Sequence, residues 1–423
     1  MSHILQRMSS AFSDGNPFGL YSVCSAHPLV LRAAMRQALA DDSPLLIEAT
    51  CNQVNQFGGY TGMRPADFRD FVTSLAQREG YAPENLIFGG DHLGPNPWSH
   101  LPAEEAMVLA EEMVAEYSRA GFAKIHLDAS MSCLGEENPL PDSIVAGRAA
   151  RLCRAAEQNS GGSPRYYVIG TEVPIPGGAT ESLAELEVTS YDHAAHTLET
   201  HRKTFAEAGL TQVWPRVIAL VVQPGVEFNH DSVIDYSSPK TVELQKLLRD
   251  VGGLVFEAHS TDYQKPAAFR ELVHDGFAIL KVGPGLTFAL REVLFGLEKI
   301  EQELFASEKC SHLAELMDQE MLAHPEHWAK HYHGTASEQK TLRRYSYSDR
   351  IRYYWGLPAV QTAVNTLMRN LDSVEIPETL VSAMLPEQYH AIRERGLRAT
   401  PEEIAMLAVQ QALQPYAVAA SAR

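Results

Sequence analysis

Short apolar runs alternate with longer amphipathic stretches between residues 18 and 283. Each short run is rich in β-branched and aromatic residues and stops at glycine, proline or polar residues, as a buried strand does. The predicted strands are FGLYSVCSA (18–26), PLLIEAT (44–50), LIFGGDH (86–92), AKIHLDA (123–129), YYVIGTEV (166–173), RVIALVVQ (216–223), LVFEAHS (254–260) and FAILKVG (277–283). The stretches between them space their apolar residues as helices do. Eight strands that alternate with helices predict a (β/α)8 TIM barrel.

A doubly wound open sheet is the alternative fold for the same alternation. It usually carries a glycine-rich fingerprint after its first strand, and VCSAHPL (23–29) has none. The reactive side chains also favour the barrel, because they lie at the C-terminal ends of the runs: Cys24, Glu48, Asp91, His92, His126, Asp128, Glu172, Gln223, Glu257, His259 and Lys281. In a barrel these ends converge on one mouth, where active sites are built. A single His or Glu at such a position is more often structural, so it is their joint placement that indicates a functional mouth.

The pattern changes after Gly283, where the remaining chain is rich in predicted helices. We therefore predict a barrel over residues 1–290 and an α-helical C-terminal extension over 291–423 that caps the barrel or forms a subunit interface. Within the extension, RRYSYSDRIRYYW (343–355) is rich in Arg and Tyr. Three interpretations stay open: Arg350 and Arg352 bind a phosphate, the run packs in a core or interface, or it is a solvated helix face.

Composition narrows the classes of function. The chain has 35 Lys and Arg against 53 Asp and Glu, a net charge of −18, which argues against a nucleic acid or an anionic membrane as partner. The five cysteines form no CxxC pair and are expected to be reduced, buried thiols. No signal peptide or run of membrane-spanning length is visible, so a cytoplasmic location is expected.

Two histidines and several carboxylates at one mouth suit a divalent metal ion. His92 and His259 are the expected ligands, with zinc first and manganese, cobalt or nickel as alternatives. The alternative is that both imidazoles only bond to loop backbone. No HExxH motif is present, which argues against a zinc protease of that kind.

Several longer motifs carry a resemblance. In chain order they are VCSAHPL, LLIEATCNQVNQFGGYTG, GGDHLGP, KIHLDASMS, IGTEVPIPGG, VVQPGVEF, FEAHSTDYQ and LKVGPGLTFALRE. Together they resemble the Z-subunit family of tagatose-bisphosphate aldolase over nearly the whole chain. The resemblance implies either a D-tagatose 6-phosphate 4-epimerase of galactitol and tagatose catabolism or a non-catalytic subunit that supports a catalytic aldolase subunit. Some relatives are labelled tagatose-6-phosphate kinases, but no GxxxxGK[ST] loop occurs here.

The strand ends are also similar, more distantly, to the metal-dependent class II aldolases. That similarity implies Asp91 as the acid/base, His92 and His259 as metal ligands, and a catalytic role for Glu172. Gln223 replaces a third zinc histidine. It is then a weaker ligand through its amide oxygen, or it only forms hydrogen bonds, or the metal is lost altogether. HSTDY and GPGL replace the phosphate-binding loops, and Asp262 would repel a phosphate on C1.

The chemistry of the implied substrate fits these changes. Tagatose 6-phosphate and fructose 6-phosphate differ at C4, whose proton is not acidic, so inversion requires cleavage and re-formation of the C3–C4 bond. A metal would act as Lewis acid while Asp91 moves the proton of the C4 hydroxyl. Glu48, Asp128, Lys281 and Asp262 are expected to contact the substrate. We therefore predict the 4-epimerase, with the non-catalytic aldolase subunit as the main alternative, aldolase activity of this chain alone as a weaker one, and a catalytic aldolase subunit or a second copy as possible partners.

Overall fold

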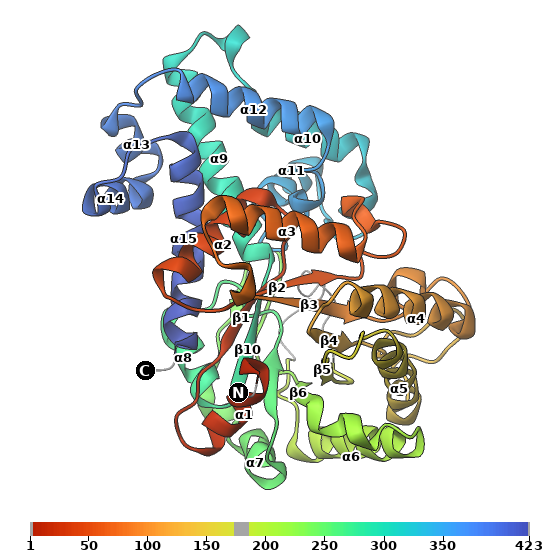
Figure 1. Cartoon of the computed structure of the whole chain (residues 1–423). Coiled ribbons are helices and arrows are strands. Elements are labelled where there is room, and N and C mark those ends of the chain that lie inside the picture. The colour runs from red at the N-terminus through yellow and green to blue at the C-terminus, as the bar shows by residue number, and fades with distance from the viewer. Residues whose placement is uncertain (1–2, 173–185, 422–423) are drawn as a thin grey trace.

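The computed structural model describes residues 3–172 and 186–421. Within them, eight parallel strands close into a barrel in chain order, with the last strand pairing to the first (Figure 1). The strands are β1 (Leu20–Val23), β2 (Leu45–Thr50), β3 (Leu86–Leu93), β4 (Lys124–Leu127), β5 (Tyr166–Ile169), β6 (Val217–Val221), β9 (Val255–Ala258) and β10 (Phe277–Val282). The short strands β7 (Glu227–Phe228) and β8 (Val233–Ile234) form a separate antiparallel pair. The predicted (β/α)8 barrel is confirmed.

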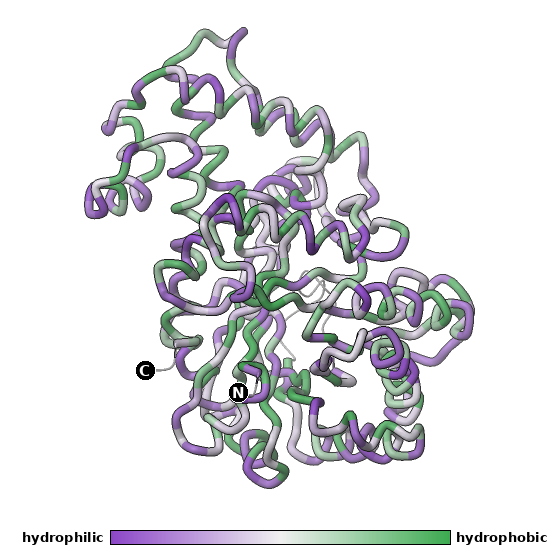
Figure 2. The backbone as a smooth tube through the Cα atoms, viewed as in Figure 1, coloured by the Kyte–Doolittle hydropathy of each residue, from purple (hydrophilic) through white to green (hydrophobic). Residues whose placement is uncertain are grey.

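A helix follows each barrel strand and covers the outside of the barrel. These helices are α2 (Pro28–Ala40), α3 (Pro65–Glu79), α4 (Ala103–Arg119), α5 (Asp142–Gln158), α6 (Tyr191–Glu207), α7 (Val242–Val251), α8 (Pro266–His274) and α9 (Pro284–Leu304). The tube coloured by hydropathy shows hydrophobic stretches along the strands and alternating colours along these helices (Figure 2). Such amphipathic helices bury one face against the sheet and leave the other in solvent.

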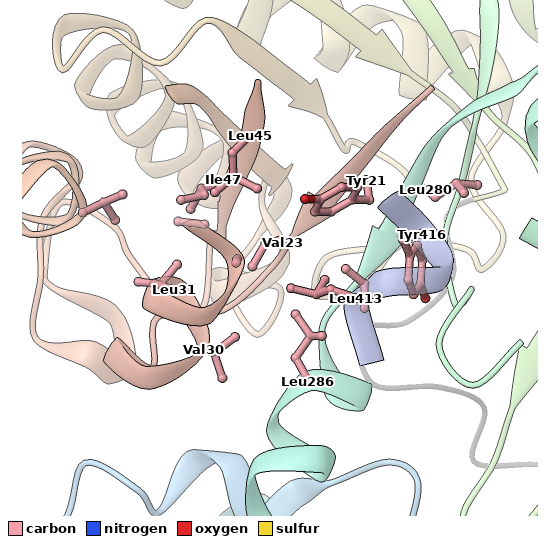
Figure 3. Packing of buried hydrophobic residues seen from close by; sticks show 14 of the residues in the cluster. Tyr21, Val23, Val30, Leu31, Leu45, Ile47, Leu280, Leu286, Leu413 and Tyr416 are labelled. Atoms are coloured by element: carbon pink, nitrogen blue, oxygen red, sulfur yellow. The ribbon is translucent and has the colours of Figure 1, made fainter. Parts of the chain in front are cut away.

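The core has two layers because successive strand residues face opposite sides of the sheet. Leu45 and Ile47 of β2 face outward into the cluster shared with the helices (Figure 3). Leu46, between them, faces inward and belongs to a second cluster that fills the barrel floor. The N-terminal helix α1 (Ile4–Ser13) closes this floor with Leu5 and Met8. The next inward position of β2 is Glu48, so the barrel interior becomes polar toward the mouth.

The rest of the chain is helical, with α10 (Leu313–Ala323), α11 (Ala336–Tyr345), α12 (Pro358–Asp372), α13 (Glu378–Met384), α14 (Pro386–Arg395) and α15 (Pro401–Ala420). The boundary predicted at residue 290 falls inside α9. The last helix, α15, returns to the barrel and packs against α2, α8 and α9 (Figure 1). The hydroxyl of Tyr416 donates to the backbone oxygen of Thr261 at 2.9 Å, and Arg32 pairs with Glu402 at 2.7 Å. The last helix of the extension is therefore tied to the barrel near both of its own ends.

None of the helices in the described part of the chain combines the length and the apolar character needed to cross a lipid bilayer.

Candidate active site at the barrel mouth

The end of β3 places two adjacent reactive side chains inside the barrel. A regular strand would turn Asp91 and His92 to opposite faces. Here the pairing of β3 with β4 shifts register between Gly90 and Leu93, and His92 takes a left-handed conformation with φ of 50°. Both side chains consequently line the same cavity at the mouth. Gly89 makes room beneath them, because a Cβ there would stand 2.6 Å from the carboxylate of Glu48.

Three buried histidines meet at this mouth, and each has one ring nitrogen held by a carboxylate. His92 Nδ1 lies 2.8 Å from Asp128, His126 Nδ1 2.9 Å from Asp91, and His259 Nε2 2.9 Å from Glu257, in each case measured to a carboxylate oxygen. Their ring centroids lie 4.9 to 5.3 Å from one another. Histidines that bind metals are commonly oriented in this way, with the second nitrogen bonded to an acidic residue.

Four residues of the mouth could hold one metal ion. Asp91, His126, Glu257 and His259 each offer a ligand atom, these atoms lie within 4.8 Å of one another, and all four side chains are buried. His126 Nε2 is buried without a hydrogen-bond partner among the described residues, as a nitrogen reserved for a metal would be. Burial lowers the pKa of His259 to about 4, which keeps its imidazole neutral. Imidazole and carboxylate ligands together suit zinc and neighbouring transition metals.

Two buried lysines balance the acidic groups beneath this cluster. Lys124 Nζ lies 2.5 Å from Glu48 Oε1 and 2.8 Å from Glu257 Oε2, as ion pairs rather than well-directed hydrogen bonds. Lys281 Nζ donates to Glu48 and lies 3.0 Å from Asp91 Oδ1. Burial would lower the pKa of Lys281, but the carboxylates around it, Asp91 foremost, raise it well above its usual value. Lys281 is therefore a fixed cation and not a nucleophilic amine.

The same field keeps Asp91 ionised. Burial opposes its charge, but His92, Lys281 and the bond from His126 outweigh burial and hold the pKa of Asp91 well below its usual value. Asp91 is therefore present in the ionised form that a general base requires.

Asp262 stands at another wall of the cavity and caps a helix. Its Oδ1 accepts hydrogen bonds from the backbone N–H groups of Gly283, at 3.0 Å, and Gly285, at 2.7 Å. These groups belong to the N-terminus of α9, which is where a phosphate would otherwise be bound favourably. Burial raises the pKa of Asp262 to about 6.

Comparison with known proteins gives the family. Residues 5–421 match the family described as D-tagatose-1,6-bisphosphate aldolase subunit GatZ/KbaZ-like. The chain belongs to this family. The resemblance seen in the motifs is thereby confirmed. Membership of this family supports a function related to tagatose-bisphosphate aldolase.

Three solved structures are similar to this chain to different degrees. A probable tagatose 6 phosphate kinase from Sinorhizobium meliloti is 50% identical, with a TM-score of 0.88 over 95% of this chain and 100% of that one. A fructuronate-tagaturonate epimerase from Cohnella laeviribosi is 15% identical, with a TM-score of 0.49 over 94% of this chain and 81% of that one. A fructose-bisphosphate aldolase from Campylobacter jejuni is 13% identical, with a TM-score of 0.44 over 87% of this chain and 91% of that one. The last two similarities are too distant to bear on activity.

Most of the predicted site residues of this GatZ/KbaZ-like chain lie together at the mouth: Glu48, Asp91, His92, Asp128, His259, Asp262 and Lys281. Two do not join them. Gln223 uses its amide oxygen to accept from the backbone N–H groups of Gly225 and Val226, at 2.8 and 3.0 Å. Glu172 accepts from the Thr189 hydroxyl and lies 2.7 Å from His193 Nδ1. Residues 173–185, which include the predicted end of that strand at residue 173, lie outside the described residues.

Three groups in the site carried no role in the sequence analysis. His126 and Glu257 stood among the strand-end residues without an assigned function. Lys124 was missed because it begins β4 rather than ending it. Its signal was its spacing, because residues 124 and 126 face the same side of a strand and His126 faces the interior. Arg352 and Tyr353 also line the mouth cavity. A phosphate-binding role for Arg352 was one of the three interpretations of the Arg- and Tyr-rich run, but nothing in that run pointed to the barrel mouth.

Proposed function

We propose that this chain is a D-tagatose 6-phosphate 4-epimerase, which interconverts D-tagatose 6-phosphate and D-fructose 6-phosphate. The observation that carries the proposal is the ionised, buried Asp91 carboxylate next to a candidate metal cluster, in a cavity whose helix N-terminus is already occupied by Asp262. A sugar with a free C1 hydroxyl suits such a cavity better than a 1,6-bisphosphate, since a phosphate on C1 would meet a carboxylate.

The chemistry follows from the substrate. C4 is β to the C2 carbonyl, so its configuration inverts when the C3–C4 bond breaks and re-forms. Asp91 accepts the proton of the C4 hydroxyl as the bond electrons move toward C3 and the C2 oxygen, and C4 becomes an aldehyde. After the aldehyde presents its other face, the bond forms again and Asp91 returns the proton to the C4 oxygen. Lys281, which borders the cavity, would stabilise the negative charge that develops on the substrate oxygens.

A bound divalent cation would supply Lewis-acid polarisation of the substrate oxygens. His126, Glu257 and His259 would hold it, which leaves Asp91 for the proton. His92 is the further ligand candidate, because its ring lies 4.9 Å from that of His259 and Asp128 orients it. Gln223, which was predicted as a ligand, would have to give up its two backbone hydrogen bonds to take that role.

Incubating the purified chain with D-tagatose 6-phosphate and zinc, manganese, cobalt or nickel tests the proposal. We expect fructose 6-phosphate to form, and we expect deuterium placed on C4 to remain there, since the C4–H bond never breaks. Absence of the product with every metal would overturn the epimerase, and loss of the C4 label to solvent would overturn the cleavage mechanism.

The second candidate function is that of a non-catalytic subunit of tagatose-1,6-bisphosphate aldolase, which the description of the family favours. This function needs the outer surface of the chain rather than its mouth. A catalytic aldolase subunit that co-purifies with the chain and gains equal activity from wild-type and Asp91→Asn protein would support it.

A further inference from the structure

The helical extension places a cation at the barrel mouth. Arg352 lies in the short helix η9 (Arg350–Tyr353), far along the chain from the last barrel strand. It lines the mouth cavity together with Asp91, His259 and Lys281. It also lines a neighbouring cleft of about 760 Å³, whose walls include the start of α2 and part of α12. Arg352 therefore stands where the cleft joins the cavity.

The guanidinium of Arg352 is held in place but retains donors. Nη1 donates to the backbone oxygens of Ser348 and Asp349, and Nη2 donates to the Tyr353 hydroxyl at 2.8 Å. Its Cζ lies 4.5 Å from the centroid of the Tyr353 ring. None of these bonds uses Nε, and a guanidinium carries five N–H groups. A planar cation with a fixed orientation and spare donors is the group that binds phosphate oxygens best.

Arg352 has little competition for an anion in this cavity. Among the described residues that line it, Lys281 is the other lysine or arginine. The ammonium of Lys281 is paired with Glu48 and Asp91, so it lies at the reacting end of the cavity, and it does not border the cleft. Arg350, two positions earlier, does not border the cavity: it is buried and donates to the backbone oxygen of His327 at 3.0 Å. The two arginines of one motif thus have different surroundings, and Arg352 alone of the two faces the mouth.

We propose that Arg352 binds the phosphate group of a sugar phosphate whose reacting carbons lie at Asp91, so that the C-terminal extension supplies the specificity for phosphorylated substrates. This inference rests on the proposed function for the orientation of the sugar. Asp262 borders the mouth cavity but not the cleft, whereas Arg352 borders both. The unphosphorylated C1 end would therefore lie toward Asp262, and the C6 phosphate would lie at the junction with the cleft.

Binding measurements on the full-length, metal-loaded protein test the inference. The ligands are D-tagatose 6-phosphate, D-tagatose and inorganic phosphate, and the proteins are wild type, Arg352→Gln, Arg352→Lys and Arg369→Gln. Arg369 is a matched control, because it is an exposed arginine of α12 that borders neither the cavity nor the cleft. Calorimetry gives the dissociation constants, and circular dichroism reports folding.

We expect Arg352→Gln to weaken binding of D-tagatose 6-phosphate by about 10- to 100-fold, the usual effect of losing a charge-assisted hydrogen bond. The affinity of Arg352→Gln for D-tagatose should equal that of wild type. Inorganic phosphate should compete with D-tagatose 6-phosphate for the wild-type protein but not for Arg352→Gln. Arg352→Lys should fall between wild type and Arg352→Gln, since it keeps the charge but loses the fork geometry. Arg369→Gln should match wild type.

Equal weakening for D-tagatose and its 6-phosphate would indicate a purely structural role and overturn the inference, as would unchanged affinity for the 6-phosphate in folded Arg352→Gln. If Arg352→Gln does not fold, the same measurement is made on Arg352→Lys. A ratio of its affinities for D-tagatose 6-phosphate and D-tagatose that equals the wild-type ratio would overturn the inference. The assay needs no turnover. Wild-type protein that binds the 6-phosphate through Arg352 without converting it would refute the epimerase and leave this inference intact.

Discussion

The carboxylate of Asp262 accepts a hydrogen bond from the backbone N–H of Gly285 at 2.7 Å, so a side-chain anion of the protein caps the N-terminus of α9. A helix N-terminus attracts anions through its free N–H groups and its dipole. Here that attraction is satisfied internally. A phosphate that approached the same N–H groups would have to displace Asp262 and would be repelled by it.

This arrangement predicts selectivity between sugar phosphates. D-Tagatose 1,6-bisphosphate should bind more weakly than D-tagatose 6-phosphate, and Asp262→Gly should narrow the difference by freeing the N–H groups of Gly283 and Gly285. Competitive calorimetry measures both affinities. Wild-type protein that binds the bisphosphate as tightly as the monophosphate would contradict the prediction.

Asp262 should also make stability depend on pH. Burial raises its pKa to about 6 from the ordinary 3.8, so the native state holds this proton more tightly than the unfolded state does. The contribution of Asp262 to the free energy of unfolding is therefore most favourable below pH 3.8 and is lost as the pH rises through about 6. The side-chain amide of the Asp262→Asn variant can still accept both backbone hydrogen bonds. The free energy of unfolding of this variant, relative to that of wild type, should therefore be higher at pH 7.5 than at pH 4, by up to about 3 kcal/mol.

Urea unfolding of wild type, Asp262→Asn and the exposed control Asp231→Asn at the two pH values measures this gain. The comparison cancels the other titrating groups, which all three proteins share. If the free energies of unfolding of Asp262→Asn and wild type differ by the same amount at both pH values, Asp262 does not titrate as described.

Metal binding should depend on the histidines of the mouth. We expect the wild type to bind about one zinc ion per chain, and we expect His126→Ala, His259→Ala and His92→Ala each to lower the affinity by about tenfold or more. His274→Ala is the control, because its side chain is 82% exposed on α8. Metal analysis after dialysis and zinc titration provide the measurement. Wild-type zinc affinity in His259→Ala would exclude the cluster as the site.

Asp91→Asn should separate proton transfer from binding. The amide keeps the shape of the carboxylate but cannot accept the proton, so kcat should fall by roughly 10² to 10⁴ while D-tagatose 6-phosphate still binds. Asp235→Asn, a partly exposed residue paired with Lys265, should keep full activity. Steady-state kinetics together with ligand binding distinguish the two effects. Full turnover in Asp91→Asn would require another base.

Much of the fold and part of the site could be predicted from local sequence. The alternation of apolar runs with amphipathic stretches predicted the barrel, because the two periods of hydrophobicity report strands and helices directly. The barrel then implied that Asp91, His259 and Lys281 share one mouth, since parallel strands end on the same side. That inference needed only the order of strands and the position of each residue within its run.

Tertiary structure decided what local pattern could not express. The register shift at the end of β3 and the left-handed φ of His92 turn two adjacent side chains into one cavity, against the alternation that the strand alone implies. Lys124 becomes part of the site only because Glu48 and Glu257 from other strands surround it. Arg352 reaches the mouth because η9, which carries it, packs against α9, the helix that follows the last barrel strand. Periodicity reports which face of an element is buried, whereas the distance between residues far apart in the chain is set by how the elements pack.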